Sequence, residues 1–231
     1  MHTKQLQELH KKRLETQTDF YTARGLHVYF KDPLMNDKID VQRVINNVEN
    51  KLPAHLLSEI EMIVFGTFDE FQERSINAAY KDGALYISNF QDDEADLYDD
   101  IIHEISHSLE APYGYEIYGD ERVKSEFLQK RILMHDLLWA KGYKFPKSFF
   151  TNIEYDEEFD MLLYKDIGYD KLANLLTGLF ISPYAATSLR EYFATGFTEF
   201  YTHSDHNLLK KVSPALYEKI FILQDSKILD N

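Results

Sequence analysis

Residues 99–110 read Asp-Asp-Ile-Ile-His-Glu-Ile-Ser-His-Ser-Leu-Glu and contain the pentapeptide His-Glu-x-x-His. In a helix, residues four apart lie on the same face and about 6 Å apart along the axis, so His103 and His107 could bind one metal ion. Glu104 would lie beside that metal, where a general base for a metal-bound water belongs. We therefore expect residues 99–110 to form a helix that supplies half of a metal site.

The apolar residues of this stretch strengthen the interpretation. The bare pentapeptide occurs by chance in roughly 3 % of sequences of this composition, so on its own it is only a hypothesis. Ile101, Ile102, Ile105 and Leu109 form an apolar face, which predicts a helix buried on one side. Polar side chains on a half-buried helix need partners, because unpaired buried polar groups are costly. A further ligand is therefore expected elsewhere in the chain.

The composition limits the possible classes of protein. The chain has 231 residues, of which 44% are hydrophobic and 14% aromatic, so a packed core is expected rather than disorder. The net charge of -14 argues against nucleic acid and anionic membrane surfaces as partners, whereas a basic peptide would suit it. The absence of Cys excludes disulfides and thiolate ligands, so a metal must be bound by His, Asp or Glu.

The sequence also bears on the compartment. The first nine residues are polar and lack the apolar segment of a signal peptide, and no stretch is long and apolar enough to span a membrane. We therefore expect a soluble, cytoplasmic protein. Association with a virus particle, or secretion by a non-standard route, remains open.

The pattern of residues predicts an α+β fold that is mostly helical, with a small sheet of three or four strands before the motif. Asp82-Gly83, between two β-rich runs, is a strong hairpin signal. Nothing in the chain resembles a linker or a repeat, so we expect a single domain over residues 1–231. The expected helices cover residues 3–23, 40–51, 69–74, 121–141, 169–176 and 188–201, and the expected strands cover residues 26–30, 61–65 and the hairpin at 78–88.

Two features flank the motif helix. The acidic run over residues 91–96 is best explained as a helix start, because acidic side chains cap helix N-termini and favour the positive end of the helix dipole. A calcium site or a patch that steers substrate is the alternative. After Glu110, Pro112 and Gly114 are expected to stop the helix.

A second element lies far downstream, at Ser188-Leu-Arg-Glu191-Tyr-Phe-Ala. Ser188 and Glu191 have capping-box spacing, which would give Glu191 a purely structural role. Alternatively, Glu191 is the third ligand of a zinc ion bound by His103 and His107, since catalytic zinc takes three protein ligands and keeps one position for water. From these residues alone, both interpretations stay open.

The His103–His107 pentapeptide together with Glu191-Tyr-Phe-Ala resembles the protease domain of anthrax lethal factor and its relatives, compact gluzincins that include the Pro-Pro endopeptidases. The resemblance implies a gluzincin-type fold and a Zn²⁺ ion with His103, His107 and Glu191 as ligands. It also implies that Glu104 is the general base. Tyr184, seven residues before Glu191, matches a family Tyr that stabilises the oxyanion.

The resemblance covers the two motifs and about the last 45 residues, with weaker similarity over the hairpin and the first helix. The family often has a second acid one turn after the ligand Glu, but this chain has Thr195 there, so Asp100 could take that supporting role. The longer segment between the motifs implies a helical insertion over residues 115–165. Glu110 lies three residues after His107 and could compete as a ligand, so its role stays open.

The function that follows is zinc-dependent endopeptidase activity on a protein or peptide substrate. Glu104 would take the proton of the attacking water, and the phenol of Tyr184 would stabilise the developing oxyanion. The strand over residues 84–88 is expected to form the rim of the cleft and to pair with an extended peptide. The alternative is a catalytically silent structural or partner-binding component of a larger assembly, such as a virus particle or a toxin complex; a toxin effector that shares the chemistry is a third possibility.

Overall fold

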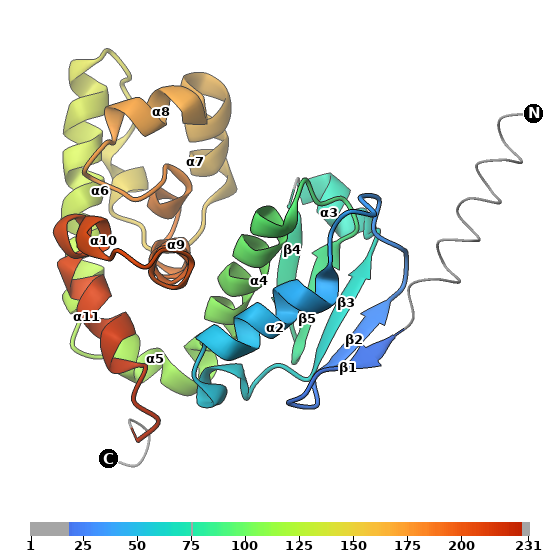
Figure 1. Ribbon diagram of the computed structural model, residues 1–231. Coiled ribbons are helices and arrows are strands. Elements are labelled where there is room, and N and C mark those ends of the chain that lie inside the picture. The colour runs from blue at the N-terminus through green and yellow to red at the C-terminus, as the bar shows by residue number, and fades with distance from the viewer. Residues whose placement is uncertain (1–18, 75, 228–231) are drawn as a thin grey trace, which may run out of the picture. The chain divides into compact units, whose positions relative to one another are not determined.

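The computed structural model describes residues 19–74 and 76–227 and has an α+β fold, mostly helical with a small sheet (Figure 1). The chain forms two compact units, Met1–Leu109 and Glu110–Asn231, whose placement relative to one another is not fixed in the structure. The sheet and the motif helix belong to the first unit. The second unit is helical. A single domain over residues 1–231, and an insertion over residues 115–165, stay predictions.

The first unit is built on a five-stranded sheet with the order β1-β2-β3-β5-β4. The three inner strands β2, β3 and β5 run parallel, whereas β1 and β4 are antiparallel strands at the two edges. The central strand is buried: Ile63 and Phe65 are at most 1% exposed. The strands are β1 (Phe20–Tyr21), β2 (His27–Phe30), β3 (Met62–Gly66), β4 (Ala78–Lys81) and β5 (Ala84–Ser88).

Helices α2 (Val41–Lys51) and α4 (Glu94–Ser108) pack against each other, and α4 also packs on β4 and β5 (Figure 1). The predicted helix start at Asp40 is confirmed, since its side chain accepts a hydrogen bond from the backbone N–H of Arg43 at 3.0 Å. The short helix α3 (Asp69–Arg74) and the η1 turn (Ala54–Leu57) complete the unit. The sheet therefore supports the helix that carries the His-Glu-x-x-His motif.

The predicted hairpin joins β4 and β5. Its two turn residues, Asp82 and Gly83, have φ angles of 50° and 82°, which is the left-handed geometry of a type I′ turn. Asp and Gly are residues that adopt this geometry readily, so the local sequence determines the connection.

In the second unit, several of the other helices pack against α9. The predicted helices over residues 121–141, 169–176 and 188–201 are confirmed to within a few residues. The elements are α5 (Glu110–Tyr118), α6 (Arg122–Ala140), η2 (Lys147–Phe150), α7 (Glu157–Met161), η3 (Leu162–Ile167), α8 (Tyr169–Leu175), η4 (Tyr184–Ala186), α9 (Leu189–Thr202), α10 (Asn207–Val212) and α11 (Pro214–Ile222). Helix α9 contacts η4, α6, α10 and α11, and Phe193, Ala194 and Phe197 are fully buried in it.

The predicted helix over residues 3–23 lies largely outside the described residues, and its end is wrong. Phe20–Tyr21 pairs with Val28 and His27 as β1, so the sheet has five strands rather than three or four. Gly25, with a φ angle of 87°, lies in the turn between β1 and β2. A strand of two residues shows no periodicity, so pairing with β2 rather than local pattern determines it.

Two further predictions are wrong. Residues 110–118 continue as helix α5, because Pro112 lies in the first helical turn, where its missing N–H has no intrahelical acceptor. The strand expected at the rim, β5, lies between β3 and β4, so the edge strand is β4.

Within residues 19–74 and 76–227, every helix is too short or too polar to cross a lipid bilayer.

Candidate metal centre

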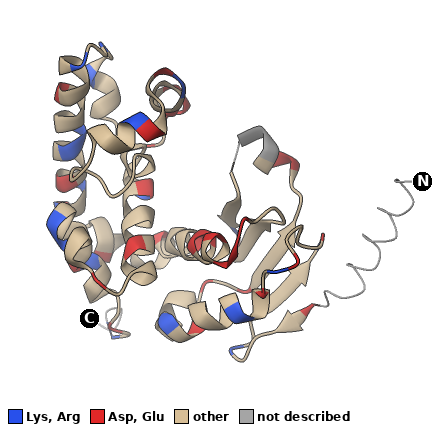
Figure 2. Cartoon of the chain, turned by 45° about the horizontal axis from the view of Figure 1, so that its top comes forward, with Lys and Arg blue, Asp and Glu red and all other residues tan. Residues whose placement is uncertain are grey.

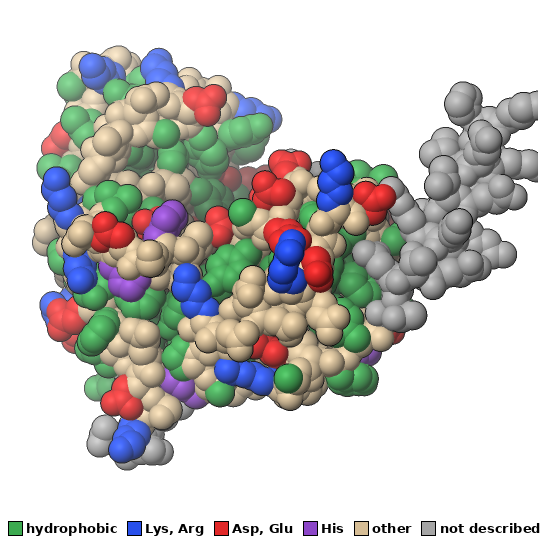
Figure 3. Space-filling model, viewed as in Figure 1, with side chains coloured by type: hydrophobic (Ala, Val, Ile, Leu, Met, Phe, Trp, Pro, Cys, Tyr) green, Lys and Arg blue, Asp and Glu red, His purple; other side chains and the backbone are tan. Residues whose placement is uncertain are grey.

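The start of α4 is fixed by acidic side chains, as the sequence predicts. The carboxylate of Asp93 accepts hydrogen bonds from the backbone N–H groups of Ala95 and Asp96, at 2.8 and 3.0 Å. Glu94 accepts from Arg43 Nε at 3.1 Å and from the backbone N–H of Asp40 at 2.9 Å, which ties α4 to α2. Acidic residues accordingly colour the first turn of α4 in Figure 2, and acidic side chains gather over this region of the first unit in Figure 3. The acidic run is therefore confirmed as a helix start.

The two His side chains of the motif lie next to each other on α4. The centroids of the His103 and His107 rings are 5.0 Å apart, and the ring planes meet at 80°. The helix places them there because its opposite face is fully buried: Ile101, Ile102 and Ile105 are at most 1% exposed. The two imidazoles are thus neighbours on one face of α4, as helical spacing predicts, and their role as metal ligands stays a prediction.

Glu104 lies in a defined position between the helix and the sheet. Its side chain is only 8% exposed, and its Oε2 accepts a hydrogen bond from the backbone N–H of Tyr80 at 2.8 Å. Tyr80 belongs to the edge strand β4, so this bond fixes the carboxylate against that strand. A carboxylate held in this way is positioned to accept a proton from a neighbouring water.

Asp100, one turn before His103, has a half-buried carboxylate that accepts a hydrogen bond from Gln91 Nε2 at 3.1 Å. Burial raises the pKa of Asp100 to about 6, although the hydrogen bond from Gln91 opposes this effect. The nearby His103 also lowers the pKa of Asp100. Its electrostatic interaction with His103 is consistent with the supporting role expected for Asp100, which stays a prediction.

Glu191 lies in the first turn of α9, in the second unit. Ser188 is the N-cap, and its Oγ accepts a hydrogen bond from the backbone N–H of Glu191 at 3.1 Å. The capping role of Ser188 is thus confirmed. The bond uses the main chain of Glu191 rather than its carboxylate, so capping by Ser188 does not conflict with a ligand role for Glu191.

Tyr184 lies on the η4 turn just before α9. Its carbonyl accepts hydrogen bonds from the backbone N–H and the hydroxyl of Thr187, at 3.0 and 2.8 Å. The N–H of Leu189 donates to the carbonyl of Ile153 at 2.8 Å, which holds the start of α9. Tyr184 and Glu191 therefore lie on one hydrogen-bonded segment of the second unit.

The structure gives Glu110 a partner within the second unit. Its carboxylate accepts hydrogen bonds from Arg190 Nε and from the hydroxyl of Tyr118, the latter at 3.0 Å. Burial raises the pKa of Glu110 despite these two donors. Glu110 thus joins the start of α5 to the first turn of α9, beside Glu191.

Two buried cations on α6 were missed from the sequence. Arg131 donates to the carbonyls of Ala186 and Thr187, and Lys130 Nζ donates to the hydroxyl of Tyr192 at 2.7 Å. The spacing of residues in α6 could have indicated that Arg131 is buried. Arg131 lies on the same helical face as the buried residues Phe127, Met134 and Leu138. A cation at such a position must have internal partners.

Two His residues, His203 and His206, follow the end of α9. His203 Nδ1 is 3.3 Å from a carboxylate oxygen of Glu199, and the His206 ring stacks on Phe200 with centroids 4.1 Å apart. Both contacts are local and lie beyond the predicted ligand positions.

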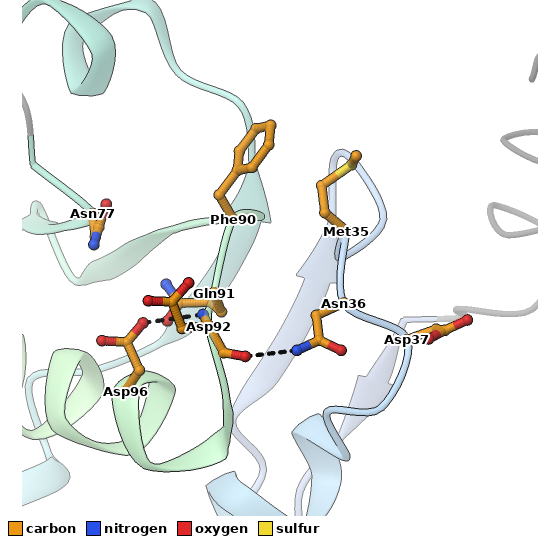
Figure 4. Close-up of a pocket in the computed structure, with 8 residues that line it drawn as sticks. All are labelled: Met35, Asn36, Asp37, Asn77, Phe90, Gln91, Asp92 and Asp96. Carbon is orange, nitrogen blue, oxygen red and sulfur yellow. Dashed lines mark hydrogen bonds between the residues drawn. The ribbon is translucent and has the colours of Figure 1, made fainter.

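A hollow of about 500 Å³ lies between the loop after β2 and the start of α4 (Figure 4). Asp92 and Asp96 line it, and a hydrogen bond of 2.7 Å joins Asn36 Nδ2 to the carbonyl of Asp92 across it. Among the described residues, the carboxylates here do not form a group of three or more ligands for a metal ion. The calcium alternative therefore gains no support.

Comparisons of the chain with protein-family models, with curated proteins and with solved structures found no match. The likeness to lethal-factor-type peptidases therefore rests on the sequence motifs alone.

Proposed function

We propose that the protein is a zinc-dependent endopeptidase in which His103, His107 and Glu191 bind the metal. Two imidazoles and a carboxylate are a donor set that could hold one metal ion. The chain has no Cys, and this nitrogen and oxygen set is one that catalytic zinc uses. The observation that carries the proposal is the pair of adjacent His rings on α4, with the buried Glu104 fixed beside them.

A zinc ion at these residues would supply a Lewis acid that makes a water molecule nucleophilic near neutral pH. Glu104 would accept the proton of that water and donate it to the leaving amine. Its hydrogen bond to Tyr80 favours one position of the carboxylate, so little ordering would be needed before proton transfer. A purely structural metal site would need no such base.

Tyr184 would act on the substrate carbonyl. Its phenol would donate a hydrogen bond to the oxygen on which negative charge develops, an interaction that is stronger in the transition state than in the ground state. The bonds of Thr187 to the Tyr184 carbonyl fix the turn that carries this phenol.

The substrate class that we propose is an extended peptide. Strand β4 pairs with β5 on one side and, within the described part of the sheet, has no strand on the other. Such an edge can bind an extended peptide through its main-chain groups other than the N–H of Tyr80, which already donates to Glu104. Because Glu104 binds Tyr80 on β4, a peptide at this edge would pass close to the base.

The test is cleavage of a diverse peptide library by the purified chain with added zinc, with chelator and with Glu104→Gln as controls. We expect cleavage that needs zinc and is lost in the variant, while the variant keeps its metal. If the wild type binds zinc but cleaves nothing in the library, the alternative of a catalytically silent component replaces the proposal.

A further inference from the structure

Arg131, on α6, is among the largest fully buried side chains of the protein and is 1% exposed. Its guanidinium lies among aromatic rings: the Cζ atom is 4.2 Å from the ring centroid of Phe159, 5.3 Å from that of Phe127 and 5.8 Å from that of Phe150. Burial lowers the pKa of Arg131 to about 9, so the side chain still carries its charge at neutral pH. The protein therefore maintains a buried cation here, which requires specific compensation.

Part of that compensation comes from main-chain carbonyl groups, and the negative charge of Asp156 also favours the charged form of Arg131. Nη1 donates to the carbonyls of Ala186, at 2.5 Å, and Thr187, at 3.1 Å, and Nη2 donates to the carbonyl of Phe149. The planar guanidinium can serve several acceptors at once in a fixed geometry, which the ammonium of a lysine cannot do. Arg131 thereby fixes the path of the main chain at Ala186 and Thr187.

These two carbonyls occupy a particular place in the chain. Ala186 is the last residue of η4, the turn that carries Tyr184, and Thr187 directly precedes Ser188, the N-cap of α9. Tyr184 therefore lies just before the bonded carbonyls and Glu191 lies one helical turn after them. A shift of the main chain at this point would move both side chains.

We propose that Arg131 is a positioning residue that holds Tyr184 and Glu191 in the geometry that the metal site needs. This inference rests on the proposed function, because it assigns Arg131 a role in the same site. If Arg131 served only the stability of the core, an apolar side chain could replace it without a specific effect on residues 184–191.

The test compares Arg131→Lys and Arg131→Met with Leu138→Ala, a variant of another fully buried residue of α6. Leu138→Ala controls for general loss of stability, and all measurements are made at a temperature where each variant is folded by circular dichroism. The first readout is amide hydrogen exchange over residues 184–191. We expect at least about tenfold faster exchange there in both Arg131 variants than in the control, because the main-chain bonds that order the segment are lost.

The second readout is zinc affinity, measured by competition with a chelator, together with kcat and KM on a cleaved peptide. We expect Arg131→Lys to bind zinc about tenfold more weakly and to lose about tenfold or more in kcat with little change in KM, whereas Leu138→Ala keeps wild-type values. The inference is overturned if the Arg131 variants match the control in exchange, or if Arg131→Lys binds zinc as tightly as the wild type. If the wild type binds no zinc at all, the proposed function is wrong, and the role of Arg131 in a zinc site is then wrong as well.

Discussion

Replacing Glu104 by Gln should remove catalysis while leaving the fold almost unchanged. The amide oxygen of Gln can accept the hydrogen bond that Tyr80 N–H donates to Glu104 at 2.8 Å, but the amide cannot take a proton. General acid–base catalysis by one side chain contributes about 10²–10⁴-fold in rate, which corresponds to about 3 to 5 kcal/mol of transition-state stabilisation. We expect a loss of that size in kcat/KM, and a change of about 1 kcal/mol or less in the free energy of unfolding.

Glu104→Ala separates this effect from a structural one. Alanine removes the acceptor for the N–H of Tyr80, and an unpaired, partly buried N–H costs about 1–3 kcal/mol. The Ala variant should therefore lose the same activity as the Gln variant but unfold at lower urea concentration. The assay is kcat/KM on one peptide, urea unfolding and metal analysis of all three proteins. If Glu104→Gln retains more than about a tenth of the activity, Glu104 is not the base.

Two further predictions concern stability. Asp93→Ala should lower the free energy of unfolding by about 1 kcal/mol, because it removes the N-cap of α4. Asp93→Asn keeps a side-chain oxygen as acceptor and should lower it less. Equal losses of the two variants in urea unfolding would contradict the capping role of Asp93. Burial lowers the pKa of Lys130 from 10.5 to about 8. Between pH 8 and pH 10.5, Lys130 is therefore protonated in the unfolded chain but mostly neutral in the folded protein. Because the unfolded chain binds more protons in this range, the free energy of unfolding rises with pH there, by up to about 3 kcal/mol. Lys130→Met lacks this titrating group, so the free energy of unfolding of the wild type minus that of the variant should be greater at pH 10 than at pH 7.5. An equal difference at both pH values would refute the lowered pKa of Lys130.

The elements that could be predicted are those that short stretches of sequence determine. Asp40 and Ser188 mark helix starts that the structure confirms, since a capping side chain acts on N–H groups two or three residues away. Asp82-Gly83 marks the hairpin because its turn needs positive φ angles at both residues. The adjacent His rings on α4 follow from helical spacing in the same way.

The features that were missed depend on residues far apart in the chain. The order of the strands, which makes β4 and not β5 the edge, follows from which strands pair and not from any one segment. Pro112 was misread because a helix stop and a first-turn proline look the same until the start of α5 is known. One of the two partners of Glu110 is Arg190, eighty residues away. The hydrogen-bond acceptors of Arg131 are main-chain carbonyls, which have no signature in the sequence.

The proposed zinc site requires Glu191 as a ligand together with His103 and His107. Its most direct test is a zinc titration, with chelator competition, of the wild type, Glu191→Ala and Glu199→Ala, the last being a matched change of the other acid on α9. We expect one zinc ion per wild-type chain, a loss of at least about 100-fold in affinity in Glu191→Ala, and wild-type affinity in Glu199→Ala. If Glu191→Ala binds zinc as tightly as the wild type, then Glu191 is only part of a capped helix start and the proposed three-ligand site is wrong.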